Sequence, residues 1–247
     1  MIIMISQPTF FPWLGYFDMI RLVDKVVILD DVKFNYQSWQ HRNHFKDPNG
    51  LKLFTIPVID GKKKQNINHV KLQNPIFSKN KLIKFISSNY NKSLYFKGIK
   101  HELFDIFDQS FKEGKLLNLN MGIIKWCLTY LKVNTRIIYS SDLHLKNKKT
   151  ERLIEICQKL GAKEYLSTAG AIDYLDKEMH LFSKAKIKIQ FHNYNHPKYN
   201  QLFDGFKEYA CILDLILNEG SNSLKILKSG NLNKFQFNWF AKFNIFF

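Results

Sequence analysis

Apolar residues recur with two different spacings near the start of the chain. Residues 2–6 and residues 25–29 are short apolar runs, which are typical of strands buried in a parallel sheet. Between them, residues 14–23 place apolar side chains three or four positions apart, as on one face of a helix. A strand, a helix and a strand within about thirty residues predict a βαβ unit with a parallel sheet.

The middle of the chain departs from this alternation. Residues 39–45 and 51–58 flank the turn sequence DPNG at residues 47–50, and this combination predicts a β-hairpin. Residues 69–72 are expected to form one more short strand. Helical spacing then predominates, and it predicts three helices, over residues 75–90, 100–111 and 116–131.

Strand and helix patterns alternate again in the last part of the chain. Strands are predicted over residues 136–139, 164–167 and 186–191. Thr150 has the residue type and position of an N-cap, and it predicts a helix that ends at Gly161. Further helices are predicted over residues 171–184, residues 203–218 and a short stretch beyond Gly220. The fold class predicted is therefore α/β, with a doubly wound, mostly parallel sheet.

Length and composition are compatible with one large domain. The chain has 247 residues, of which 45% are hydrophobic, enough for a sizeable core. We expect a single domain over residues 1–230, with a hairpin inserted at about residues 34–72 and a helical segment at about 74–131. Residues 231–247 are expected to form a tail. These patterns leave the strand order open.

The chain is strongly basic. It has 37 Lys and Arg residues against 21 Asp and Glu, for a formal net charge of +16. Such a surplus attracts the phosphates of nucleotides, nucleotide sugars, coenzyme A or RNA. Because the lysines are scattered, a solvated lysine-rich surface explains the charge equally well. The aromatic content of 15% serves the core, a ligand pocket, or both.

Cysteine usage and the first residues indicate the compartment. Cys127, Cys157 and Cys211 are odd in number and widely spaced, which argues against a disulfide framework and against a cysteine zinc site. Each lies in an apolar helical pattern, so we expect it to be buried. The N-terminus lacks a basic segment, and no apolar run approaches the ~18 residues of a membrane-spanning helix. We therefore expect a soluble, cytoplasmic protein.

A loop rich in proline and aromatic residues joins the first strand to the first helix. In open α/β sheets, ligands bind beyond the carboxyl ends of strands and against helix N-termini. Trp13 and Tyr16 could stack on a base or a sugar, and Gly15 would let a backbone or phosphate approach closely. The alternative is a rigid, aromatic-packed loop with no ligand.

The second strand ends at two carboxylates, Asp30 and Asp31. Either could accept the proton of a substrate amine or hold Mg²⁺. Adjacent residues of a strand point to opposite faces, so we expect only one of them to face a pocket. A turn or cap pair is the alternative explanation.

A dense polar and aromatic run follows at residues 37–43. On a strand, Trp39, His41 and Asn43 would share one face, and Arg42 would point to the other. His41 suits a general base near neutral pH, and Arg42 suits a bidentate grip on phosphate. An exposed hairpin strand is the alternative. A second histidine three positions after His41 would not reach the same metal ion, so no metal site is expected.

Three later segments are further candidates. Lys149 precedes the expected helix start, where it would form an anion site; a capped, solvated helix start is the alternative. Residues 165–171 form a strand-to-helix turn of small residues that could cradle a phosphate or be an ordinary corner. His196 lies in a polar run after the last strand, where it could reach the pocket or lie in a surface loop.

Five segments in order resemble the WbqC-like family. They are QPTFFPWLGYFDMI, DDVKFNYQSWQHRN, NGLKLFTIPV, KTERLIEICQKLGAKEYLS and YNHPKYNQLFDGFKEYACILDLILNEG, and together they reach nearly to the end of the chain. The family's motif positions here are Gln7, Pro12, Trp13, Gly15, Asp31, Trp39, Arg42 and Asn43. The resemblance implies biosynthesis of O-antigen, lipopolysaccharide and related surface polysaccharides, with a role as a glycine or aminoacyl transferase.

Amide formation is the reaction that fits both the family resemblance and the candidate site residues. A neutral sugar amine must attack an activated acyl carbon, which requires a base, oxyanion donors and a grip on the nucleotide. The hypothesis is an acyltransferase that acts on a nucleotide-linked amino sugar. The candidate catalytic residues are His41 and Asp31, and the candidate substrate-binding residues are Gln7, Trp13, Gly15, Tyr16, Trp39, Arg42, Asn43, Lys149 and His196.

The donor and several alternatives stay open at this point. The acyl group could come from acyl-CoA, from an aminoacyl-tRNA, or from an ATP- and Mg²⁺-dependent ligase step. The net charge of +16 also suits a nucleic-acid-binding module, although no RNA-binding motif is present, so nucleic acid is expected only as a tRNA donor. A non-catalytic assembly partner of glycosyltransferases is the last alternative. The oligomeric state is left open.

Overall fold

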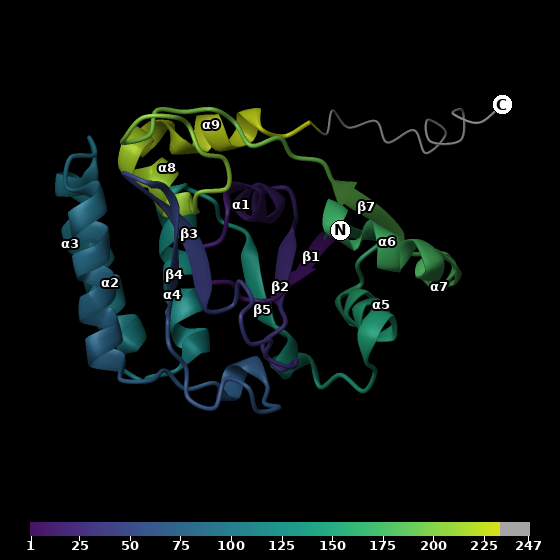
Figure 1. Cartoon of the computed structure of the whole chain (residues 1–247). Helices are drawn as coiled ribbons and strands as arrows, with labels where there is room; N and C mark the ends of the chain where they lie inside the picture. The colour runs from purple at the N-terminus through teal and green to yellow at the C-terminus, as the bar shows by residue number, and fades with distance from the viewer. Residues whose placement is uncertain (233–247) are drawn as a thin grey trace.

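The computed structural model describes residues 1–232 apart from the side chain of Tyr174, and these form an α/β fold around a five-stranded parallel sheet (Figure 1). The strands are β1 (Ile2–Ser6), β2 (Lys25–Ile28), β5 (Arg136–Tyr139), β6 (Glu164–Thr168) and β7 (Lys188–His192). Their order in the sheet is β5-β2-β1-β6-β7, and every neighbouring pair is parallel. The predicted fold class and the predicted βαβ unit are confirmed.

Side chains of β1 alternate between two cores, one on each face of the sheet. Met4 packs in the larger core with Phe17 of α1 (Leu14–Arg21), and Ile3 packs in the smaller core with Phe182 of α7 (Met179–Lys184). Ile156 of α5 (Lys149–Leu160) also lies in the smaller core. Strands buried on both faces read as continuous apolar runs, which is why the first six residues show no polar alternation.

The segment between β2 and β5 contains the hairpin and the helical middle. The hairpin is formed by β3 (Arg42–Asp47) and β4 (Gly50–Thr55) in antiparallel register. It is followed by α2 (Pro75–Tyr90), α3 (Phe96–Phe111) and α4 (Leu116–Tyr130). Figure 1 shows α2 and α3 at one end of the molecule and α5–α7 at the other, with the sheet between them. The inserted hairpin and the helical middle are both confirmed.

The chain after β7 returns to the larger core. Helix α8 (Ile212–Glu219) contributes buried residues to it, and α9 (Ser223–Ser229) packs against α1. Figure 1 shows α8 and α9 along one edge of the molecule. The predicted cysteine burial is confirmed, since Cys127, Cys157 and Cys211 are buried and unpaired. Within residues 1–232, no helix has both the length and the hydropathy needed to cross a bilayer.

Four local predictions are wrong. Residues 39–41 form turns instead of extending β3, because Gln37 adopts a positive φ of 61° and the His41 amide bonds back to the Ser38 carbonyl. Residues 67–69 form a 3-10 turn, and the expected strand over 69–72 reduces to isolated bridges. The helix expected over 171–184 is divided into short pieces, and the one expected over 203–218 begins only at residue 212.

Most of the expected tail, residues 233–247, lies outside the described residues. Residues 231 and 232 are described, and Asn231 pairs with Tyr194 in an isolated antiparallel bridge.

Candidate functional site

A cavity lies where the sheet changes the direction of its connections. The chain leaves β1 toward β2 through α1 on one face, and it leaves β6 toward β7 through α7 on the other face. In open α/β sheets a crevice forms at such a switch point, beyond the carboxyl ends of the two strands. The last residues of β1 and β6, Ser6 and Thr168, both line a cavity of about 570 Å³ here.

The wall of this cavity, which we call the switch-point cavity, is rich in aromatic side chains. Its eleven lining residues are Ser6, Thr9, Pro12, Trp13, Tyr16, Trp39, Asn43, His44, Leu51, Thr168 and Tyr209. They come from β1, the loop after it, α1, the hairpin region, β6 and the loop before α8. None of them is Asp, Glu, Lys or Arg. Of the predicted site residues, Trp13, Tyr16, Trp39 and Asn43 meet here.

Trp13 is the N-cap residue of α1, and its indole lies against Gly15. A Cβ at Gly15 would lie 2.6 Å from Cζ2 of the indole, closer than real Cβ contacts. The ring also packs edge-on against Tyr194, with centroids 5.5 Å apart, and against Tyr209 at 6.1 Å. The space above Gly15 is therefore filled by the indole instead of by a phosphate.

Two predicted residues support the floor of the cavity. The Tyr16 hydroxyl donates to the carbonyl oxygen of Gln7 at 3.4 Å, and burial raises the pKa of Tyr16 more than its hydrogen bond with Ser6 lowers it. This phenol therefore stays neutral at physiological pH. The Gln7 side-chain oxygen accepts a hydrogen bond from Gln40 Nε2 at 2.7 Å, which ties β1 to the turn before β3.

The side-chain amide of Asn43 stabilises the conformation of the loop after β1. Its Nδ2 donates to the carbonyls of Phe10, at 3.0 Å, and Phe11, at 2.7 Å, while its Oδ1 accepts from the His44 amide at 2.8 Å. Phe11 has a positive φ of 43°, a conformation that needs such external support in a non-glycine residue. Asn43 therefore lines the cavity mainly as a structural residue.

His41 lies outside the wall of the cavity and has both ring nitrogens engaged. Nδ1 lies 2.9 Å from the Ile56 carbonyl oxygen, and Nε2 accepts from the Gln37 amide at 3.1 Å. These bonds fix the neutral tautomer with its proton on Nδ1. Burial, together with the Arg42 charge, lowers the pKa of His41 despite the opposing bond to Ile56. The lone pair that a general base needs is already occupied in this structure.

His44 has the freedom that His41 lacks. It is partly exposed in the wall of the cavity, and its ring packs against Trp39 with centroids 5.4 Å apart. Within the described part of the chain, its ring nitrogens form no hydrogen bond. The sequence pattern indicates His44 only as a possible second metal ligand beside His41, because it predicts a strand that starts at residue 39 instead of residue 42.

Asp31 belongs to a separate cluster of polar side chains, which lies beyond the carboxyl ends of β2 and β5. It forms an ion pair with Arg152 of α5 and accepts a hydrogen bond from Ser140. Burial would raise the pKa of Asp31, but the Ser140 and Arg152 interactions together lower it. The neighbouring Asp30 accepts from Ser140 and Ser141. Neither carboxylate lines the switch-point cavity.

The predicted cations also lie outside the cavity wall. Arg42 opens β3 opposite Thr55 and is partly buried. Lys149 is exposed in the first turn of α5, where Lys148, and not Thr150 as predicted, is the N-cap residue. The Thr150 hydroxyl instead donates to the carboxylate of Glu178. An acidic group therefore already interacts with the first turn of this helix.

His196 lies behind the wall of the cavity. Its ring centroid is 5.6 Å from that of Tyr209, which lines the cavity, and 6.0 Å from that of Tyr199. Nδ1 contacts the Pro197 carbonyl at 3.2 Å, and Nε2 is buried without a hydrogen-bond partner among residues 1–232. Burial lowers the pKa of His196. His196 therefore packs against Tyr209 and does not itself line the cavity.

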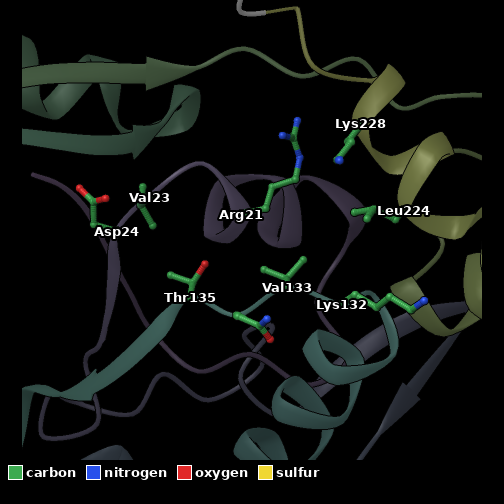
Figure 2. Close-up of a pocket in the computed structure, with 9 residues that line it drawn as sticks. Arg21, Val23, Asp24, Lys132, Val133, Thr135, Leu224 and Lys228 are labelled. Atoms are coloured by element: carbon green, nitrogen blue, oxygen red, sulfur yellow. The ribbon is translucent and has the colours of Figure 1, made fainter.

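A second hollow, of about 320 Å³, lies at the amino ends of β2 and β5 (Figure 2). Figure 2 shows Arg21, Lys132 and Lys228 around it, projecting from α1, the α4–β5 connection and α9. Arg21 is paired with Asp18, and all three cations lie near helix C-termini, where positive charge offsets the exposed carbonyls. A structural role accounts for this basic hollow.

One family model and one relative match most of the chain. The model of the WbqC-like protein family matches residues 7–226. The uncharacterized protein Rv1507c of Mycobacterium tuberculosis is 32% identical over 226 residues, which cover 91% of this chain and 96% of that protein. No solved structure matches the chain.

Proposed function

The chain belongs to the WbqC-like protein family, and from this premise we propose that it is a transferase in surface-polysaccharide biosynthesis. The proposed reaction moves an acyl or aminoacyl group, such as glycyl, onto the amine of a nucleotide-linked amino sugar. The observation that carries the proposal is the switch-point cavity, where the His44 imidazole lies beside the exposed ring of Trp39 and forms no hydrogen bond with the described residues.

The proposed step is an acyl transfer in which atoms and protons balance. The amine nitrogen attacks the activated acyl carbon, a carbon–nitrogen bond forms, and the bond from that carbon to the donor's leaving group breaks. In this step His44 accepts the proton that the amine loses and passes it to the released donor group. Thr9 and Thr168 line the same cavity, and their hydroxyls, which form no hydrogen bond with the described residues, would donate to the oxyanion of the tetrahedral intermediate.

The site residues predicted from the sequence have different roles in this proposal. The assignment of His41 as base stays a prediction, and the backbone bonds to both of its nitrogens favour His44 instead. Asp31 is engaged by Arg152 and Ser140, so its role as base requires those bonds to open. Trp13, Tyr16 and Trp39 would pack the sugar. Arg42 and Lys149 would meet phosphate only outside the cavity wall.

Product masses test the proposal directly. The protein is incubated with nucleotide-linked amino sugars and with acyl-CoA, aminoacyl-tRNA or free acid donors, each with and without ATP and Mg²⁺. The expected result is an acceptor heavier by one acyl group, formed from a preactivated donor without ATP. Product formed only with ATP and Mg²⁺ would instead identify a ligase, and no product from any donor would contradict the proposal.

A further inference from the structure

The distribution of charge around the switch-point cavity contrasts with that of the whole chain. The chain carries a net charge of +16, yet the eleven residues that line the cavity include no Lys, Arg, Asp or Glu. A phosphate brought into such a wall would lose its water and gain no cation in return. The positive charge of the protein therefore does not serve this cavity.

The wall offers exposed aromatic faces instead. Trp39 is 51% exposed and Tyr209 is 56% exposed, so both rings keep uncovered surface in the wall of the cavity. An aromatic face carries a partial negative potential, and it attracts weakly positive C–H groups. The C–H face of a sugar ring fits these platforms.

The polar atoms that are free in the cavity are suited to hydroxyl groups. Within residues 1–232, the hydroxyls of Thr9 and Thr168 and the ring nitrogens of His44 form no hydrogen bond. A hydroxyl both donates and accepts, so it can pair with a sugar hydroxyl in either direction. The Asn43 amide is already engaged and shapes the wall without being free to bind.

We infer that the switch-point cavity receives the uncharged sugar ring of the acceptor and that the acceptor's phosphates stay outside it. This inference rests on the proposed function and makes it more specific. Binding in the cavity then depends on aromatic stacking and neutral hydrogen bonds, so its dissociation constant responds little to salt. A site built around phosphate would lose affinity steeply as salt rises.

Calorimetric titration tests this with an uncharged probe, the methyl glycoside of an N-acetylated amino sugar, and with inorganic pyrophosphate as the charged probe. We expect the glycoside to bind with a Kd that changes less than about twofold over a tenfold range of NaCl concentration. We expect pyrophosphate not to compete with it. No saturable binding of the glycoside up to its solubility limit, or its displacement by pyrophosphate, would overturn the inference.

A pair of variants locates the binding. Trp39→Ala removes an exposed ring from the wall, and we expect it to weaken glycoside binding by about tenfold or more. Tyr36→Ala is the matched control, because Tyr36 is 45% exposed in the same segment and does not line the cavity. Both variants are first checked for an unchanged thermal transition. Equal effects of the two would place the probe elsewhere.

The outcome is separable from that of the proposed transfer. If the glycoside binds in this way but no acylated product forms, the cavity assignment stands and the transferase proposal fails. If product forms but the glycoside binds only with pyrophosphate-like salt dependence, the transfer stands and the cavity assignment fails.

Discussion

The indole of Trp13 lies in the space that a side chain on Gly15 would need. A Cβ at Gly15 would lie 2.6 Å from Cζ2 of that ring and would overlap its outer carbons. Trp13 is part of the cavity wall, so the absence of a side chain two residues later in α1 determines the shape of the site. The relation links one backbone position to the proposed binding surface.

Gly15→Ala is therefore expected to lower both the free energy of unfolding and the affinity of the switch-point cavity for the methyl glycoside probe. Ala raises intrinsic helix propensity by about 0.5–1 kcal/mol, but overpacking costs about 1–3 kcal/mol, so the net free energy of unfolding should fall. Displacement of Trp13 should weaken ligand binding by about tenfold, or about 1.4 kcal/mol. Urea unfolding and calorimetric titration measure the two effects.

Gly98→Ala is the control for this substitution. Gly98 lies in α3, and no atom comes within 4 Å of a Cβ placed there. We expect this variant to gain stability and to bind normally. If Gly15→Ala gained stability to the same degree, the close packing between Gly15 and Trp13 would be disproved.

The sequence predicts β1, α1 and β2 well because their burial is local. A strand buried on both faces and a helix with one apolar face each have a recognisable local pattern, and in these three elements no tertiary contact overrides it. The helix α2 is predicted with its exact bounds, where Pro75 begins it at a position that suits proline.

The helix expected over residues 203–218 shows what a periodic pattern misses. Its apolar spacing is helical, but Phe203, Gly205 and Tyr209 adopt positive φ values, which a helix does not allow. The Lys46 ammonium donates to the carbonyls of Phe203 and Gly205, at 3.0 and 2.5 Å. That contact comes from the hairpin, far away in the sequence, and stabilises a loop in place of a helix.

The candidate site was only partly predictable for a similar reason. Trp13 and Tyr16 follow from the strand–loop–helix pattern at the start of the chain. Thr168 and Tyr209 reach the cavity only because β6 lies beside β1 and the loop before α8 folds back to Trp13. The spacing of apolar residues does not specify the order of the strands in the sheet, so it could not predict that these residues meet in one cavity.

His44 and His41 are expected to respond differently to the same substitution. His44→Gln should lower the transfer rate by about 10²–10⁴-fold, because a positioned general base contributes that much. His41→Gln should change the rate per folded molecule little, since both of its ring nitrogens are already bonded to the backbone. The measurement is the initial rate of acylated product, with the folded fraction determined in the same samples. The reverse result would return the role of base to His41.

The buried pair of Asp18 and His192 is expected to hold α1 against β7. His192 Nε2 donates to Asp18 Oδ2 at 2.7 Å, and both side chains are almost fully buried. His192→Leu leaves a buried carboxylate short of a partner, and losing one member of a buried pair costs about 3–5 kcal/mol. Because Arg21 and Asn231 also bind Asp18, we expect a loss near the lower end of that range.

His192→Gln separates the hydrogen bond from the shape of the ring. A glutamine amide can still donate to Asp18, so we expect its free energy of unfolding to fall by about 1 kcal/mol, clearly less than that of the leucine variant. Urea unfolding monitored by circular dichroism gives both values. Equal losses in the two variants would show that the packing of the ring, and not the carboxylate, determines the stability.

Stability is expected to fall as the pH drops below the ordinary pKa of histidine, with His41 as one cause. Burial lowers the pKa of His41 below its usual value of 6.5, so between 6.5 and the folded value the unfolded chain binds a proton that the folded chain does not. The free energy of unfolding therefore decreases with falling pH in that window, by at most about 1.4 kcal/mol per pH unit for one proton. His41→Gln should remove this part of the slope in urea unfolding between pH 7 and 5. Identical slopes in the wild type and His41→Gln would show that protonation of His41 is not coupled to folding.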